Sequence, residues 1–105
     1  MKFSTIITLI CLLISTLFTQ AKDYFFMAQE DHYFENPANW YPSYPGVKIG
    51  KEDRIVLMTD ANANGYDIEI EGVLEIQLGA TLTSSSSKLI VKTGGLVDND
   101  GSLLV

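Results

Sequence analysis

Short apolar runs return at a near-constant interval in residues 67–105, and glycine turns separate them. The runs cover residues 74–76, 89–91 and 103–105. Fifteen residues separate Leu74 from Leu89, and the same interval separates Gly79 from Gly94. This spacing, with almost no helical periodicity, is typical of an all-β solenoid in which strands of successive coils pair in parallel.

Polar and apolar residues alternate through the first part of this stretch. Ile68 and Ile70 are expected on the inner face of a strand, with Glu69 and Glu71 outside, and the alternation resumes with Leu74, Ile76 and Leu78 inward. Residues 54–58 read as the first clear strand and residues 59–66 as a polar surface loop. We therefore predict a short single-stranded parallel β-helix over residues 51–105. A small β-sandwich of hairpins is the alternative, because hairpins also use glycine turns.

Aromatic residues are concentrated ahead of the ladder. Residues 24–44 hold eight aromatic side chains, and three prolines in residues 37–45 disfavour a long helix there. An apolar core that is open at one end needs a cover, and large rings bury much area per residue. Residues 22–50 are therefore predicted to form an aromatic N-terminal cap.

The N-terminal segment, residues 1–21, has the pattern of a cleaved signal peptide. Lys2 precedes an apolar run over residues 3–18, and small residues surround the expected cleavage after Ala21. The run is shorter than the roughly twenty residues of a membrane-spanning helix, so no stable span is expected after cleavage. Residues 22–105 hold no cysteine, and their thirteen acidic residues outnumber six basic ones. This charge makes nucleic acid a poor partner, and it suits a secreted or cell-surface protein.

A longer pattern carries a family resemblance. It comprises Phe34-Glu-Asn-Pro-Ala-Asn-Trp40, a Pro-Gly turn at residues 45–46, Glu-Asp-Arg-Ile-Val at residues 52–56, and the Gly-x-Leu ladder from Gly72. With these motifs the chain resembles the secreted bacterial β-helix modules of autotransporter passenger-like proteins. It is also similar to the eight-glycine extracellular β-domain. The resemblance implies a secreted structural or adhesive role and transfers no catalytic residue.

Two groups of residues are candidates for binding. Trp40, Tyr41 and Tyr44 could present flat faces to a sugar, although burial of these rings in the cap is favoured because buried aromatics are commoner than exposed clusters. Asp60, Asn62, Asn64 and Glu71 match the ligand spacing of an EF-hand calcium loop, with Gly65 at the turn. The flanking sequence is strand-like, whereas an EF-hand needs flanking helices. The alternative to a calcium site is therefore a polar surface turn. No cofactor other than calcium is suggested.

The sequence offers few candidate catalytic residues. Glu69, Glu71 and Glu75 could form an acidic groove of the kind that cleaves polysaccharides, but no basic residue lies in the same strands. We predict a non-catalytic structural or adhesive module that binds an extracellular protein or a glycan. A small carbohydrate-binding module, or part of a larger glycan-active protein, is the alternative. The apolar strand at residues 103–105 further predicts self-association through its edge.

Overall fold

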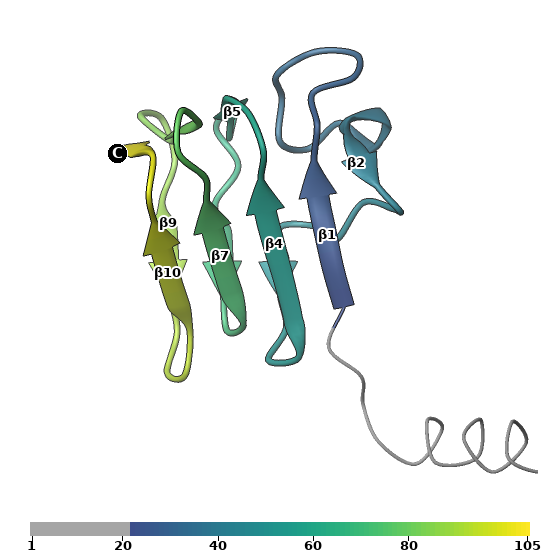
Figure 1. Ribbon diagram of the computed structural model, residues 1–105. Coiled ribbons are helices and arrows are strands. Elements are labelled where there is room, and N and C mark those ends of the chain that lie inside the picture. Colours follow the sequence, from purple (N-terminus) through teal and green to yellow (C-terminus); the bar gives the residue numbers. More distant parts are fainter. Residues whose placement is uncertain (1–21) are drawn as a thin grey trace, which may run out of the picture.

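The structure is a computed structural model that describes residues 22–105, and this part of the chain is all-β (Figure 1). The predicted signal peptide, residues 1–21, lies outside the described residues. Residues 22–105 contain eleven strands and one short 3₁₀ helix, η1 (Pro37–Asn39). None of the helical structure in this range has the length and hydrophobicity that a membrane crossing requires.

The strands form three sheets, which we call A, B and C. Sheet A has the order β10-β7-β4-β1-β2, sheet B the order β11-β8-β5 and sheet C the order β3-β6-β9. Sheet A contains β1 (Lys22–Phe26), β2 (Trp40–Tyr41), β4 (Asp53–Leu57), β7 (Val73–Ile76) and β10 (Leu96–Asn99). Sheet B contains β5 (Ala61–Asn62), β8 (Thr81–Thr83) and β11 (Ser102–Leu104). Sheet C contains β3 (Lys48–Ile49), β6 (Ile68–Ile70) and β9 (Leu89–Val91).

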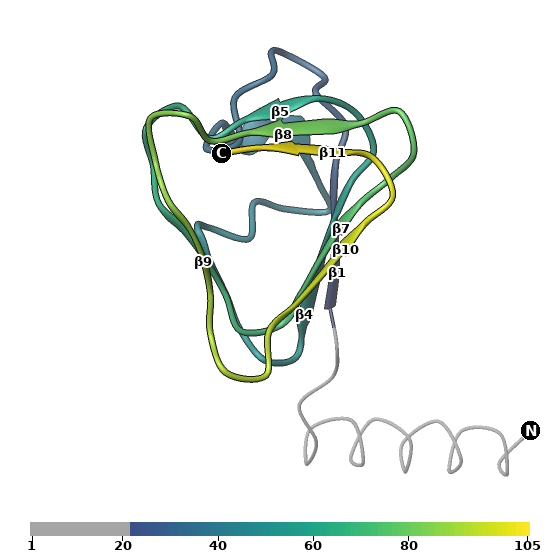
Figure 2. The ribbon, with the colours of Figure 1, turned by 90° about the vertical axis from the view of Figure 1, so that its left-hand side faces the viewer.

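From β3 onward the chain visits sheet C, sheet A and sheet B in that order, three times over. We call the passages β3–β5, β6–β8 and β9–β11 the first, second and third circuits. In Figure 2 the circuits overlay one another, and the three sheets form the sides of a triangle. All strand pairs between circuits are parallel. β1 also pairs in parallel with β4, whereas β2 runs antiparallel to β1.

The register between circuits corrects the predicted repeat length. Ile68 is the partner of Leu89 and Leu82 is the partner of Leu103, so the same interval separates paired residues of successive circuits in sheets B and C. This interval is longer than the predicted fifteen residues. In sheet A the partner of Leu74 is Val97. The prediction that Leu74 and Leu89 occupy equivalent places in successive coils is therefore wrong, because these residues lie in sheets A and C.

The shared turn geometry explains the false repeat. The Ala80 N–H donates to the Gln77 carbonyl at 2.9 Å, and Gly79 has a φ of 87°. Residues 92–95 form the same turn, with Gly94 at a φ of 87° and the Gly95 N–H bonded at 2.8 Å. Both are turns that need a positive φ at their third residue, where glycine is favoured. The turn at Gly79 leads from sheet A to sheet B, and the turn at Gly94 leads from sheet C to sheet A. The fifteen-residue interval therefore separates two turns of the same type and not equivalent positions of successive coils.

The predicted alternation holds inside the strands and fails beyond them. Ile68, Ile70, Leu74 and Ile76 are fully buried and belong to one core cluster. Leu78, predicted to point inward, is 88% exposed because it follows β7 in the turn that leads to sheet B. The loop predicted over residues 59–66 contains a short strand, β5, whose Ala61 is buried.

Candidate functional site

A recess lies where the chain passes from sheet C to sheet A. The connection from sheet C to sheet A comprises residues 50–53 in the first circuit and residues 92–95 in the third. In the second circuit it comprises only Glu71 and Gly72. Figures 1 and 2 show that the loop before β7 is shorter than the loops before β4 and β10. The result is a hollow of about 190 Å³, lined by Lys48, Ile49, Gly50, Glu69, Glu71 and Lys92.

Glycine at position 72 is what permits this short corner. A Cβ built on Gly72 would collide with the backbone carbonyl oxygens of Asp53 and Gly50 in the first circuit. Gly95 is equally confined, against the carbonyl oxygen of Ile70 in the second circuit. Because backbone atoms of a neighbouring circuit cannot move aside as a flexible side chain can, both positions require glycine.

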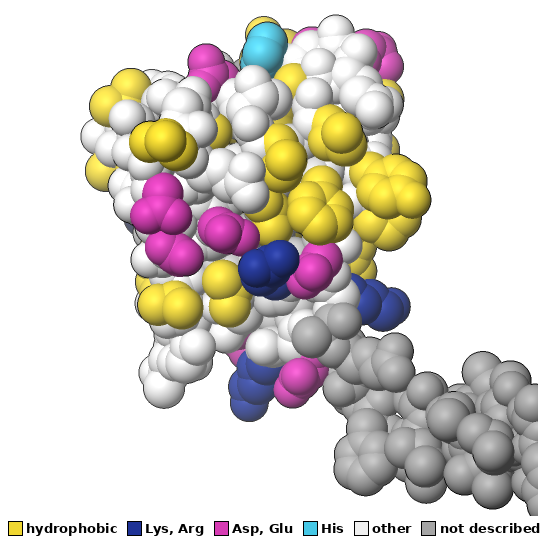
Figure 3. Space-filling view, viewed as in Figure 1, with side chains coloured by type: hydrophobic (Ala, Val, Ile, Leu, Met, Phe, Trp, Pro, Cys, Tyr) yellow, Lys and Arg dark blue, Asp and Glu magenta, His cyan; other side chains and the backbone are white. Residues whose placement is uncertain are grey.

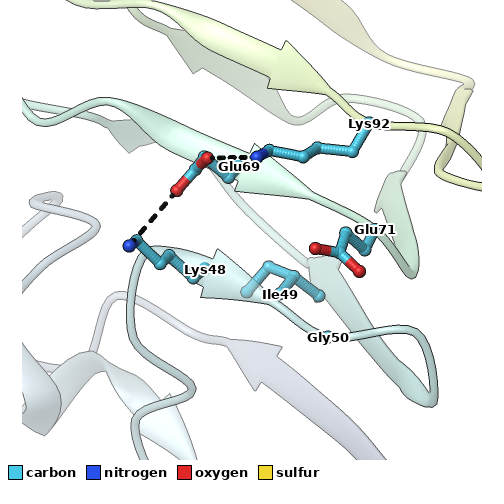
Figure 4. A pocket seen from close by; sticks show the side chains of 6 residues that line it. All are labelled: Lys48, Ile49, Gly50, Glu69, Glu71 and Lys92. Atoms are coloured by element: carbon cyan, nitrogen blue, oxygen red, sulfur yellow. Dashed lines mark ion pairs between the residues drawn. The ribbon is translucent and has the colours of Figure 1, made fainter.

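A chain of ion pairs crosses the recess from circuit to circuit (Figure 4). Glu69 accepts Lys92 Nζ at 3.0 Å on one carboxylate oxygen and lies 3.7 Å from Lys48 Nζ on the other. The hydrogen bond from Lys92, followed by the charges of both lysines, lowers the pKa of Glu69 below its usual value. The same contact raises the pKa of Lys92. The glutamate of the second circuit is thus held ionised between lysines of the first and third circuits.

This arrangement suits alignment of circuits better than acid–base chemistry. A carboxylate with a lowered pKa is a poor proton donor at neutral pH. Glu71 lies in the same recess, whereas Glu75 lies in sheet A and pairs with Arg54 at 3.2 Å. The three glutamates considered for an acidic groove therefore occupy two different surfaces. The recess is also smaller than the roughly 300–1,000 Å³ of typical ligand pockets.

Four aromatic rings, those of Phe26, Phe34, Trp40 and Tyr44, pack together beside the first circuit. Trp40 is only 6% exposed, and its ring centroid lies 5.2 Å from that of Phe26 and 4.9 Å from that of Phe34. The indole N–H donates to the Phe34 carbonyl at 2.6 Å. Phe26, Phe34 and Trp40 belong to the same buried cluster as the aliphatic residues of the circuits. The rings thus extend the core.

The three residues predicted as a sugar platform do not share one exposed face. Tyr44 packs against Trp40 with ring centroids 6.3 Å apart, and partial burial, followed by the charge of Glu35, raises the pKa of its hydroxyl. Tyr41 is 62% exposed and faces away from Trp40, because adjacent residues of a strand point to opposite sides. Sugar binding stays a prediction, and of these rings Tyr41 offers the open surface.

Asn39 is the polar centre of the aromatic segment, and sequence reasoning assigned it no role. Its fully buried side chain accepts the backbone N–H groups of Glu30 and Asp31 and donates to the carbonyl of Tyr33 at 3.0 Å and to the Asp31 carboxylate. Asp31 also accepts the Tyr33 N–H and a side-chain N–H of Asn36. These hydrogen bonds, the Tyr33 bond first, lower the pKa of Asp31. The string Asn-Pro-Ala-Asn-Trp was the available signal, because both its asparagines join this network.

The residues predicted as a calcium loop occupy two places. Asp60 accepts the Thr81 N–H at 3.0 Å, and the Asn62 side chain accepts the Asn64 N–H at 2.8 Å. Asn64 has a φ of 54° and begins a tight turn with Gly65. Glu71 lies in the recess between sheets C and A, whereas the other three lie near β5 in sheet B. Calcium binding stays a prediction.

Lys48 and Lys92 were also missed as partners of Glu69. The interval from Lys48 to Glu69 equals that from Ile68 to Leu89, and this was the available signal, but it has meaning only once the correct register is known. Residues 22–105 contain no group of three or more His, Cys, Asp and Glu side chains placed to hold a metal ion. Comparison of the chain with protein family models, curated proteins and solved structures found no match.

Proposed function

We propose that this protein is a secreted β-solenoid module with a structural or adhesive role, in which the aromatic segment caps one end. The parallel succession of sheets C, A and B through three circuits supports the solenoid. The rings of Phe26, Phe34 and Trp40, which continue the core beside the first circuit, support the cap. The signal-peptide pattern of residues 1–21 supports secretion.

The observation that carries the proposal is the open face of the third circuit. β9, β10 and β11 each lie at an edge of their own sheet, so three parallel edges meet at one end of the core. Val91, Leu96 and Leu104 of these strands are exposed, as is Val105. Unpaired edges with apolar side chains are templates for further strands. We propose that this end packs against a second copy of the chain, which gives the module its structural role.

Light scattering over a range of protein concentrations tests this proposal. The protein should associate as concentration rises, and Leu96→Lys and Leu104→Lys should weaken association by placing charge at the open edges. Leu78→Lys is the matched control, because Leu78 is exposed at a turn and not on an edge strand. A protein that is monomeric at every concentration, or edge variants that associate as the parent does, would overturn the proposal.

A further inference from the structure

The outward side of sheet A carries a buried valine that the core does not explain. Strand alternation sends Ile55 and Leu57 inward, and both belong to the core cluster. Val56 points the other way and is absent from that cluster, yet it is 0% exposed. Its cover must therefore come from side chains on the outer surface. Val56 is the register partner of Phe25, and Phe25 is the partner of Tyr41.

Two methionines extend this surface. Met27 and Met58 directly follow Phe26 and Leu57, whose side chains point into the core. Their N–H groups bond to the carbonyls of Asn39 and Phe26, so the strand pairing continues through both methionines and alternation places them outside. Both are exposed, and the Met58 N–H donates to the Phe26 carbonyl, which keeps the two strands adjacent. We call Phe25, Met27, Tyr41, Val56 and Met58 the outer apolar patch. Figure 3 shows a yellow area of this kind over β1 and β4.

Charged residues border the outer apolar patch on two sides. Arg54 lies 3.2 Å from a carboxylate oxygen of Asp23 and 3.2 Å from one of Glu75. Beyond Val56 the same row across the sheet continues with Glu75 and then Asp98. A shallow hollow next to this row is lined by Glu75, Gln77, Leu78 and Asp100. The outer surface of sheet A thus joins an apolar half to an acidic half, as Figure 3 also shows.

We propose that the outer face of sheet A docks a segment of another protein in which apolar side chains lie beside Lys or Arg. Tyr, Phe, Met and Arg are the side chains enriched at protein interfaces, and the patch with its border contains all four. Met side chains adapt to varied apolar partners but offer no flat face for a sugar ring. Two strand spacings separate Val56 from Asp98, so the apolar and basic groups of the partner should lie about 10 Å apart.

The charge of this face decides against a second copy of the chain docking here. Asp23, Glu75, Asp98 and Asp100 outnumber Arg54 on the surface described. A second copy would bring like charges together, whereas a basic segment would meet complementary ones. This surface shares β10 with the open face, but its apolar half on β1, β2 and β4 is separated from β10 by β7, so Tyr41→Ser and Leu104→Lys test the two proposals independently.

Titration calorimetry with the protein and synthetic peptides tests the docking proposal. The probe is a peptide in which pairs of leucine alternate with pairs of lysine, so that one face of the extended peptide presents both kinds of side chain. The comparison probes are the same peptide with glutamate in place of lysine, a polylysine peptide and a neutral β-glucan oligosaccharide. The leucine–lysine peptide should bind, and the other three should bind at least about tenfold more weakly. Equal binding of polylysine, or preferred binding of the oligosaccharide, would overturn the proposal.

Matched variants locate the binding. Tyr41→Ser and Asp98→Asn should each weaken binding of the leucine–lysine peptide about tenfold. Tyr66→Ser and Glu30→Gln are the controls, because Tyr66 is 51% exposed and Glu30 is exposed, yet neither lies on sheet A. Asp98 is exposed and makes no ion pair within residues 22–105, so Asp98→Asn keeps the test valid if Tyr41→Ser disturbs folding. Unchanged binding by a folded Tyr41→Ser or by Asp98→Asn would refute the assignment.

Discussion

Truncation of Leu74 should destabilise the protein far more than truncation of Leu78, although strand alternation assigns both side chains to the core. Leu74 is fully buried in β7, with Ile55 of β4 and Val97 of β10 as its register partners on either side. Leu78 is almost fully exposed in the turn after β7. We expect Leu74→Ala to lower the free energy of unfolding by about 2–5 kcal/mol, the usual range for a buried leucine. For Leu78→Ala we expect a change within about 0.5 kcal/mol.

Urea unfolding at one fixed protein concentration measures both changes. With a slope of about 1–1.5 kcal/mol per molar urea, Leu74→Ala should lower the urea midpoint by roughly 1.3–5 M. The total stability of a domain of this size is on the order of 4–12 kcal/mol, so this loss is a large fraction of it. Circular dichroism reports the strands, and the fluorescence of buried Trp40 reports the aromatic end of the core.

Agreement between these two signals would show that the circuits and the aromatic segment unfold together. Equal destabilisation by Leu74→Ala and Leu78→Ala would refute the reasoning, because it would place both side chains in the core.

Three further predictions follow from the corner, the polar network and the ion pairs. Gly72→Ala should lower the free energy of unfolding by about 3 kcal/mol, because the added Cβ collides with backbone carbonyl oxygens. Gly94→Ala should lower it by about 1–2 kcal/mol, because only the positive φ of Gly94 opposes the substitution. Equal urea midpoints for the two variants would contradict this. Asn39→Ala should lower the free energy of unfolding by about 3 kcal/mol, because it leaves two backbone N–H groups and one carbonyl without hydrogen-bond partners. Thermal unfolding measures this loss, and Asn36→Ala serves as the milder comparison. The lowered pKa values of Asp31 and Glu69 mean that their stabilising contribution is present above their usual values of 3.8 and 4.5 and is lost as pH falls further. The melting temperature should therefore drop below about pH 4.5, and the double variant Asp31→Asn, Glu69→Gln should show a shallower drop; identical pH profiles would count against it.

The strand class could be predicted from the sequence because alternation is a local signal. Ile68, Ile70, Leu74 and Ile76 sit inside strands, where period-two alternation decides which face is buried. Leu78 broke the pattern because a turn begins at Gln77, and within a turn the alternation of a strand no longer applies. Ala61 was missed because a two-residue strand is too short to alternate.

The circuit length could not be predicted because the corners differ in length. The passage from sheet C to sheet A is two residues shorter in the second circuit, and the passage from sheet A to sheet B is two residues longer, between Ile76 and Leu82. These opposite changes leave sheets B and C with the same constant interval while sheet A is offset. The similar turns at Gly79 and Gly94 then suggested a shorter repeat.

The candidate sites depended on that register. Glu69 meets Lys48 and Lys92 only because three circuits stack, and Phe25 meets Val56 only because β1 joins β4. Neither contact is local in sequence. Trp40 and Tyr41 are neighbours in sequence and differ in exposure because they lie on opposite sides of β2.

The parallel register between circuits is the central claim, and nuclear Overhauser contacts between assigned protons of the protein test it most directly. We predict contacts from Ile68 to Leu89, from Leu74 to Val97 and from Leu82 to Leu103, with the backbone pattern of parallel strands. Contacts between Leu74 and Leu89, or the close Hα–Hα pairs of antiparallel strands within sheet C, would contradict the account.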